Sequence, residues 1–342
     1  AIEFYEAVSK QGVKPILGCE IYLAPESMEH RKEVPGRKRA THLTLLAENN
    51  TGWENLVQLV TKGHLDGAYY GKPRVDRQEL RKHAEGIICL SGCIAGPVNE
   101  WLLQRQPDKA REMLEELSEI FGQDNLYVEI HDHGLEAQHE VNPQLIKLAR
   151  ELDLKLVAAN DVHFMSRDDH EAHDVMICIG TGKLVFDEKR MRYPAEVYFK
   201  SAEEMREVFQ DIPEACDNTL EIAERCNVTL SLDATSSEKY PNFEAPGGMC
   251  RDAYIRQQCF EGLERRYGKE RAESDQNLRE RLEYEIQTIN DLEFNSYFLI
   301  TADFINWAKE NGIPVGPGRG SAAGSLVAYT LGITDICPIR FG

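Results

Sequence analysis

Short apolar runs alternate with amphipathic stretches over the first half of the chain. Runs rich in Val, Ile, Leu and Tyr predict β-strands at residues 15–23, 42–47, 86–92, 126–130 and 154–161. Between them, apolar side chains recur at helical spacing in residues 108–121 and 144–151. Strands that alternate with helices favour a largely parallel sheet or barrel, in which reactive side chains gather at the carboxyl ends of the strands.

The pattern changes near residue 165, where helical periodicity replaces the alternation. Two surface helices are expected at residues 201–210 and 213–226. A charged helical stretch follows at residues 249–293, with candidate buried positions at Leu263, Leu282, Ile286 and Ile289.

A domain boundary is predicted within residues 230–248, where Ser, Asp, Pro and Gly cluster. We therefore assign residues 1–235 to a first domain and residues 236–342 to a second, which agrees with a length of 342 residues. The chain begins without Met and stops at Gly342 without a terminal element. This suggests either truncation at both ends or chosen fragment boundaries.

Composition narrows the class of protein. Hydrophobic residues make up 42% and charged residues 28%, as in soluble globular proteins. No apolar run reaches the length of roughly 18 residues that a membrane span needs, so no membrane association is predicted. Nine cysteines occur without a C-x-x-C pair, which argues against a disulfide framework and favours a reducing, cytoplasmic setting.

The net charge of −19 argues against this stretch being the main surface that holds DNA, because nucleic-acid affinity comes from phosphate neutralisation. One basic stretch, Arg31-Lys32 with Arg37-Lys38-Arg39, lies between two predicted strands. It could contact a DNA backbone, but a solvated loop is the commoner role of such a stretch.

Candidate metal ligands occur at or just after the predicted strands. They are Glu20, Cys93, Asp161 and His163. Zinc, manganese and iron accept such ligands, and the Asp-x-His spacing places two side chains on one face of an extended segment. Taken singly, a Glu or His at such a place is more often solvated, and a Cys after an apolar strand is more often core.

A glycine-rich segment, GPGRGSAAGS at residues 316–325, combines four glycines with Arg319, Ser321 and Ser325. Glycines let successive N–H groups point at one anion, and Arg319 would add a forked phosphate contact. The apolar run that follows predicts a helix whose N-terminus would also favour an anion. A flexible turn before a helix is the alternative. The spacing matches neither the P-loop nor the dinucleotide-binding motif.

The first domain resembles the PHP domain at the front of bacterial DNA polymerase III alpha subunits. The resemblance is carried by GVKPILGCEIYLAP, THLTLLAENNTGWENLVQLV, GIICLSGCIAG and LVAANDVHF. It implies a distorted (βα)7 barrel, here without its first strand region, because the family's H-x-H motif would precede Ala1. The implied ligands of Zn²⁺ or Mn²⁺ are Glu20, His42, Cys93, Asp161 and His163.

Two further histidines follow a predicted strand in the same domain. His131 and His133 are expected around the metal ligands or at the surface. In the PHP family, an intact metal site supports 3′→5′ exonuclease proofreading. Members that have lost ligands serve as a platform for a separate proofreading exonuclease.

The second domain resembles the start of the palm in the same family, a palm related to nucleotidyltransferases of the polymerase β type. The resemblance runs through FNSYFLITADFINWAKENGIPVGPGRGSAAGSLVAYTLGITDI. It implies that the triphosphate of an incoming nucleotide binds Gly318, Arg319, Gly320, Ser321, Gly324 and Ser325. Cys337 stands where the family usually has Asp. The catalytic aspartates of a P-D-x-D-x-D-F type motif are expected beyond Gly342.

The resemblance as a whole implies part of a replicative DNA-directed DNA polymerase that uses Mg²⁺, with no polymerase activity expected from residues 1–342 alone. Implied partners are primer-template DNA, deoxynucleoside triphosphates, the sliding clamp, the clamp loader and a proofreading exonuclease. One alternative is a free-standing PHP phosphoesterase, which would leave residues 294–342 without a role. Another is a non-catalytic scaffold that docks a proofreading exonuclease.

Overall fold

The computed structural model describes residues 1–232 and 241–341, which form two compact units, Ala1–Thr229 and Leu230–Gly342. The division predicted between residues 235 and 236 lies outside the described residues.

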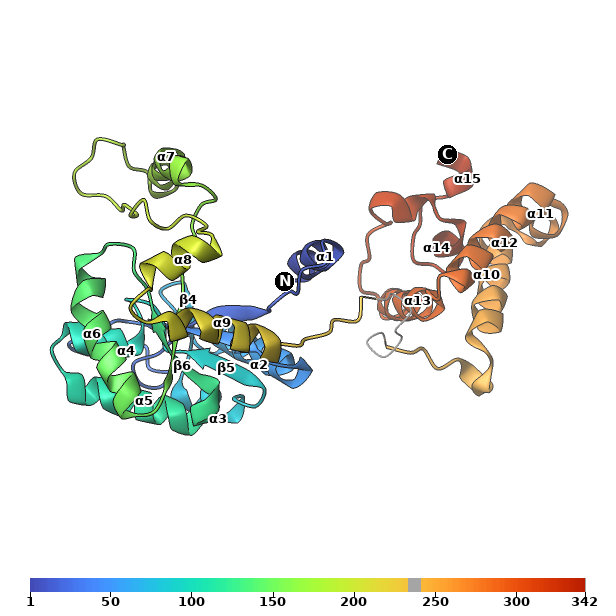
Figure 1. Cartoon of the computed structure of the whole chain (residues 1–342). Coiled ribbons are helices and arrows are strands. Elements are labelled where there is room, and N and C mark those ends of the chain that lie inside the picture. Colours follow the sequence, from blue (N-terminus) through green and yellow to red (C-terminus); the bar gives the residue numbers. More distant parts are fainter. Residues whose placement is uncertain (233–240, 342) are drawn as a thin grey trace. The chain divides into compact units, whose positions relative to one another are not determined.

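The first unit is built on a seven-stranded sheet with the strand order β3-β4-β1-β2-β5-β6-β7 (Figure 1). The strands are β1 (Gly18–Leu23), β2 (Thr41–Ala47), β3 (Ala68–Tyr69), β4 (Lys72–Val75), β5 (Ile87–Leu90), β6 (Leu126–Ile130) and β7 (Lys155–Ala158). The five strands predicted from apolar runs are therefore confirmed, with shorter bounds at β1, β5 and β7. The short strands β3 and β4 were not predicted, because their residues carry no apolar alternation.

The sheet is mixed, which corrects the prediction of a largely parallel one. Strands β5, β6 and β7 are parallel, and β1 is parallel to β4. Strand β2 runs antiparallel to both β1 and β5, and β3 runs antiparallel to β4. The reason is the connection between β1 and β2, which contains no helix in residues 24–40, whereas a parallel pair requires a long crossover. A closed barrel remains a prediction of the resemblance.

Arg74 of β4 holds this irregular connection in place. Its side chain is buried and donates hydrogen bonds to the carbonyl oxygens of Met28, His30, Arg39 and Gly67. These bonds satisfy a buried guanidinium with backbone acceptors, so the long connection is fixed without a helix of its own.

The basic stretch in this connection is largely engaged by the protein itself. Arg37 pairs with the buried carboxylate of Glu100 at 2.9 Å, and Arg39 pairs with Glu33. Arg31 donates to the carbonyl oxygen of Met28 at 2.6 Å. These contacts favour a structural role for the three arginines over a contact with DNA backbone.

Nine helices of the first unit lie along the described chain (Figure 1). They are α1 (Ile2–Lys10), α2 (Asn50–Leu65), α3 (Arg77–Lys82), α4 (Pro97–Leu103), α5 (Pro107–Phe121), α6 (Glu136–Glu151), α7 (His170–Thr181), α8 (Ala202–Val208) and α9 (Pro213–Arg225). The predicted helices at 108–121, 201–210 and 213–226 are confirmed as α5, α8 and α9. Helix α6 begins eight residues before the predicted 144–151, because it continues through Pro143.

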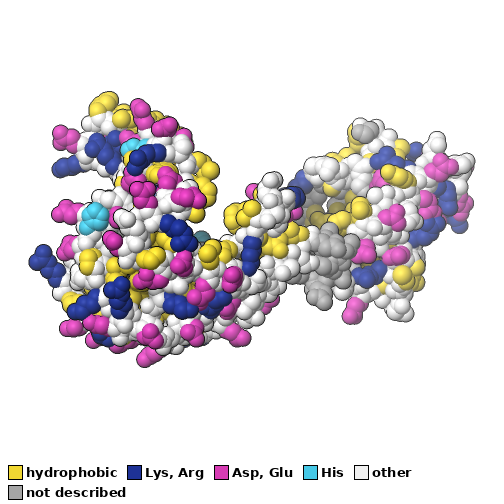
Figure 2. Space-filling view, in the orientation of Figure 1, with side chains coloured by type: hydrophobic (Ala, Val, Ile, Leu, Met, Phe, Trp, Pro, Cys, Tyr) yellow, Lys and Arg dark blue, Asp and Glu magenta, His cyan; other side chains and the backbone are white. Residues whose placement is uncertain are grey.

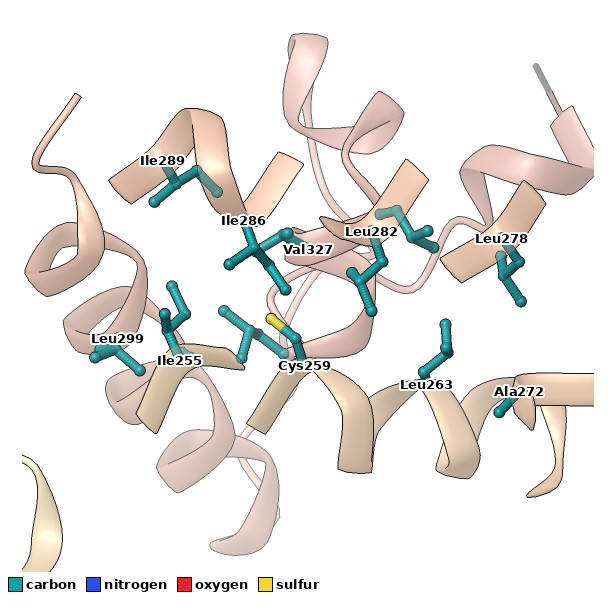
Figure 3. Packing of buried hydrophobic residues seen from close by; sticks show 13 residues of the cluster. Ile255, Cys259, Leu263, Ala272, Leu278, Leu282, Ile286, Ile289, Leu299 and Val327 are labelled. Atoms are coloured by element: carbon teal, nitrogen blue, oxygen red, sulfur yellow. The ribbon is translucent and has the colours of Figure 1, made fainter. Parts of the chain in front are cut away.

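Residues 241–341 of the second unit contain helices and connecting segments and no strand. Its helices are α10 (Arg251–Tyr267), α11 (Lys269–Ser274), α12 (Gln276–Asp291), α13 (Asn295–Glu310), α14 (Leu326–Thr330) and α15 (Pro338–Phe341). The predicted core positions Leu263, Leu282, Ile286 and Ile289 are all buried in one hydrophobic cluster (Figure 3). The palm architecture expected from the resemblance remains a prediction, since these residues contain only helices and connecting segments.

The visible surface of the chain mixes acidic and basic side chains, as Figure 2 shows. Exposed hydrophobic side chains occur around α7, among them Met176, Ile179 and Phe186. Within residues 1–232 and 241–341, no helix combines the length and the apolar character needed to cross a bilayer.

Candidate functional site

Glu20 and His42 come together across the β1–β2 pair. Glu20 lies opposite Thr44, two residues from His42, so the two side chains are diagonal neighbours on one face of the sheet. The Glu20 Oε1 and His42 Nδ1 atoms are 3.1 Å apart. Glu20 therefore lies within β1 rather than at its end, which corrects the sequence-based placement. Burial lowers the pKa of His42, although the charge of Glu20 acts in the opposite direction. The lowered pKa favours the neutral imidazole, which is the form that binds metals.

Asp161 and His163 form a second pair in the segment after β7. Their Oδ1 and Nε2 atoms are 3.3 Å apart. The His163 ring packs on Tyr193 and His173, and its backbone N–H donates to the carbonyl oxygen of Val197 at 2.8 Å. Asp161 has a φ of 46°, a conformation uncommon for residues other than glycine. The two side chains therefore lie together as predicted, but the segment turns at Asp161 and does not run extended.

Cys93 follows β5 in a tight turn that lies against β2. The backbone N–H of His42 donates to the carbonyl oxygen of Ala95 at 3.2 Å, which ties the turn to the strand. Burial raises the pKa of the Cys93 thiol to about 11, and the charges of Glu129, Asp161 and Glu20 act in the same direction. The thiol therefore lies within electrostatic reach of two predicted metal ligands.

The five predicted metal ligands thus form two pairs with Cys93 close by. In the described part of the chain, no group of three or more His, Cys, Asp or Glu side chains is arranged to hold a metal ion. The residue types nevertheless fit a divalent ion, because two carboxylates, two imidazoles and a thiol are combined. The Cys93 thiol would have to lose its proton when the ion binds, because its pKa is raised in the free protein.

A buried polar cluster beside Cys93 was not predicted as such. Glu129 of β6 accepts a hydrogen bond from the N–H of Gly92 at 3.1 Å and contacts His131 Nε2 at 2.9 Å. His133 contacts the carbonyl oxygen of Asn160 at 2.6 Å, and burial lowers its pKa. Both histidines are buried, which excludes the surface, one of the two places expected for them. A charged residue inside the apolar run LYVEI was the available signal for Glu129.

The glycine-rich segment presents unused backbone donors. The N–H groups of Gly318, Arg319, Gly320 and Ser321 donate to no protein acceptor within the residues that the structure describes. Gly318 has a φ of 123°, and a Cβ there would lie 2.9 Å from the Thr334 side chain. Successive free N–H groups in a glycine-rich turn can surround an anion.

Asp335 anchors the start of this segment. Its backbone N–H donates to the carbonyl oxygen of Pro317 at 2.8 Å. Its carboxylate accepts hydrogen bonds from Arg266 of α10 at 2.7 Å and from Lys309 of α13 at 2.8 Å. Burial opposes ionisation, but these two cations lower the pKa of Asp335. Asp335 therefore links the start of the loop to both α10 and α13.

The end of the segment is held by its own side chains. Ser325 caps α14, because its Oγ accepts from the N–H of Ala328 at 3.1 Å. The same hydroxyl donates to Glu285 of α12 at 2.9 Å, and Glu285 also accepts from the N–H of Val327 at 3.1 Å. The N-terminus of α14 is thus occupied by a protein carboxylate. This corrects the prediction that it would be open to an external anion.

A pocket of about 550 Å³ opens beside the loop. Gly316, Gly318 and Arg319 line it together with aromatic side chains of α13, including Tyr297 and Phe304. The volume lies within the range typical of small-molecule sites. A ligand whose anionic group binds the free N–H groups could therefore place an apolar group in this pocket.

Two family models match the chain. Residues 1–133 match the PHP domain, and residues 253–342 match the bacterial DNA polymerase III alpha NTPase domain. DNA polymerase III subunit alpha of Treponema pallidum is 43% identical over 100% of this chain and 29% of its own length. The subunits of Thermus aquaticus and Mycobacterium tuberculosis are 40% and 41% identical, again over 100% of this chain, which covers 32% and 30% of their lengths.

Proposed function

We propose that this chain is part of a DNA polymerase III alpha subunit and supplies the triphosphate-binding loop of that polymerase. The chain spans 29–32% of the length of the alpha subunits that it matches. The observation that carries the proposal is the row of free N–H groups at Gly318–Ser321 beside Arg319. These donors would hold the triphosphate of an incoming deoxynucleotide. The pocket lined by Tyr297 and Phe304 would take its less polar part.

In the reaction of the whole polymerase, the 3′-hydroxyl of a primer attacks the α-phosphate and pyrophosphate leaves. Mg²⁺ would neutralise the developing charge when it is bound. The residues of this chain would bind and orient the triphosphate: Arg319 by a forked, permanently charged contact, and the loop N–H groups by hydrogen bonds. Asp335 would keep the loop in position through Arg266 and Lys309.

We expect no polymerisation by residues 1–342 alone, since they contain no P-D-x-D-x-D-F type motif. The whole protein would act in the bacterial cytoplasm on primer-template DNA. Its expected partners are the sliding clamp, the clamp loader and a proofreading exonuclease.

The test is kinetic and uses the full-length polymerase that carries this chain. Arg319→Ala should raise the KM for dATP about tenfold, the effect of losing about 1.4 kcal/mol of binding, with primer-template affinity unchanged. The control is Arg265→Ala, which removes an exposed arginine from α10. An unchanged KM for dATP in Arg319→Ala would remove the proposed site.

The second candidate function is metal-dependent phosphoester hydrolysis at the PHP site, as in 3′→5′ proofreading. The Glu20–His42 and Asp161–His163 pairs, with Cys93 nearby, favour it. These five residues would hold Zn²⁺ or Mn²⁺, which would polarise the phosphoester and activate water.

Calorimetric titration of Zn²⁺ and of Mn²⁺ into the chain tests this candidate. Asp161→Asn should weaken binding of the accepted ion at least tenfold, whereas Asp168→Asn, in the same segment, should not. Equal binding by both variants and the parent would refute the metal site. Tight binding of a proofreading exonuclease without metal uptake would favour a scaffold, and cleavage of small phosphomonoesters would favour a phosphoesterase.

A further inference from the structure

Glu285 of α12 accepts hydrogen bonds at the end of the glycine-rich loop, residues 316–325. Within the described residues, no other carboxylate accepts a hydrogen bond from this loop. Its Oε2 atom lies 2.9 Å from Ser325 Oγ and 3.1 Å from the backbone nitrogen of Val327. Its Oε1 atom lies 2.7 Å from Arg281 Nε, and the carboxylate is largely buried. Both oxygens are therefore committed to the end of the loop and to its own helix.

Arg281 completes the link between α12 and the loop. Its Nη2 atom donates to the carbonyl oxygen of Gly324 at 2.9 Å, while its Nε atom binds Glu285. The Arg281–Glu285 pair thus holds three consecutive parts of the chain: the last glycine of the loop, the cap residue Ser325 and the first turn of α14. Hydrogen bonds of this kind, with a charged partner, are stronger than neutral ones.

The location of Glu285 is unexpected for a site that should attract phosphate. A carboxylate beside a triphosphate would repel it, so removing the charge alone should improve anion binding. The contacts give the carboxylate a different role. It fills the N-terminus of α14, which leaves Gly318–Ser321 as the loop donors without a protein acceptor among the described residues.

We propose that Glu285, oriented by Arg281, is a positioning residue that fastens the end of the loop and directs the triphosphate to the N–H groups of Gly318–Ser321. This rests on the proposed triphosphate site. The loop is then fixed at both ends, by Asp335 near Pro317 and by Glu285 near Ser325. A loop held at both ends loses less conformational entropy when the ligand binds.

The charge and the hydrogen bonds of Glu285 can be separated by two substitutions in the full-length polymerase. Glu285→Ala removes both, and it should raise the KM for dATP about tenfold with kcat within about threefold. Glu285→Gln keeps an acceptor for Ser325 and Val327 but removes the charge and the acceptor for Arg281 Nε, so its KM should rise less than that of Glu285→Ala. Repulsion alone would instead lower the KM in both variants.

The matched control is Glu280→Ala, which removes an exposed carboxylate from the same helix. A KM for Glu285→Ala at or below that of the parent overturns the inference. Such a result with a raised KM in Arg319→Ala would leave the triphosphate site standing. If Arg319→Ala also has an unchanged KM, the proposed function itself fails.

Hydrogen exchange in the unaltered polymerase gives a test that does not depend on the folding of any variant. The amides of Val327 and Ala328 should exchange slowly without nucleotide, and those of Gly318–Ser321 should become protected when dATP binds. Fast exchange at Val327 in the free polymerase would overturn the inference.

Discussion

Gly92 shows how a single residue sets the geometry beside the candidate metal site. Its φ is 90°, and a Cβ there would lie 2.2 Å from the carbonyl oxygen of His42. Its N–H donates to Glu129, which also contacts His131. The absence of a side chain therefore lets the turn that carries Cys93 lie directly on the strand that carries His42.

We expect Gly92→Ala to lower the free energy of unfolding of the first unit by at least about 2 kcal/mol, because it combines an unfavourable φ with a backbone clash. Urea denaturation followed by circular dichroism measures this loss. Gly134→Ala is the matched control, since Gly134 has a φ of 72° but no atom within 4 Å of the added Cβ. The control should lose only about 1 kcal/mol. Equal losses would show that the contact with His42 carries no cost.

At the scale of elements, Asp335 joins three parts of the second unit. Its carboxylate binds Arg266 of α10 and Lys309 of α13, and its backbone holds Pro317 at the start of the loop. The Sγ atom of the neighbouring Cys337 lies 2.9 Å from the hydroxyl oxygen of Tyr267. The glycine-rich loop thus depends on ion pairs between helices as well as on its own turns.

The lowered pKa of Asp335 predicts a pH dependence of stability. An unfolded aspartate titrates near pH 4, so the contribution of Asp335 should be fully present above that pH and disappear as the pH falls through the lower folded value. Because the side chain is 37% exposed, screening limits this contribution to about 1 kcal/mol.

The difference in unfolding free energy between the parent and Asp335→Asn measures the contribution of the Asp335 carboxylate. This difference should be present at pH 7 and should shrink below pH 4. Asp303→Asn serves as the control, because Asp303 of α13 forms no ion pair within the described residues. A difference that stays constant down to pH 2 would contradict the assignment of the stabilisation to the Asp335 carboxylate.

At the scale of the whole molecule, the second unit has a hydrophobic core of its own. Helices α10, α12, α13 and α14 contribute buried side chains to one cluster, with Leu282 fully buried near Cys259 and Leu263 (Figure 3). A core that is complete within one unit is expected to unfold as a cooperative block.

We therefore expect Leu282→Ala to lower the free energy of unfolding of residues 241–341 by about 2–5 kcal/mol, the cost of removing a buried leucine side chain. Peptide-resolved hydrogen exchange should then show faster opening in α10–α14 and unchanged exchange in β1–β7. Leu292→Ala, at an exposed position after α12, should change neither the free energy of unfolding nor the hydrogen exchange. Faster exchange in β1–β7 as well would show that the two units share their stability.

Several features of this protein could be predicted from the sequence because they depend on neighbours along the chain. Apolar runs predicted β1, β2, β5, β6 and β7, and helical spacing predicted the buried positions of α10 and α12. Asp161 and His163 were predicted to lie together because two residues of separation place side chains on one face. The glycine-rich segment was recognisable from its composition alone.

Only the tertiary structure decided the rest, because it depends on partners far apart in the chain. The apolar pattern of β2 does not indicate the direction in which it pairs, and nothing near Arg74 in the sequence indicates that it satisfies carbonyl groups in residues 28–39. Glu285 has the sequence setting of a solvated helical carboxylate, yet its partners lie 40 and 42 residues away at Ser325 and Val327. A charged side chain in a helix carries no local mark of which distant N–H it accepts from, so such anchors emerge only when the chain has folded.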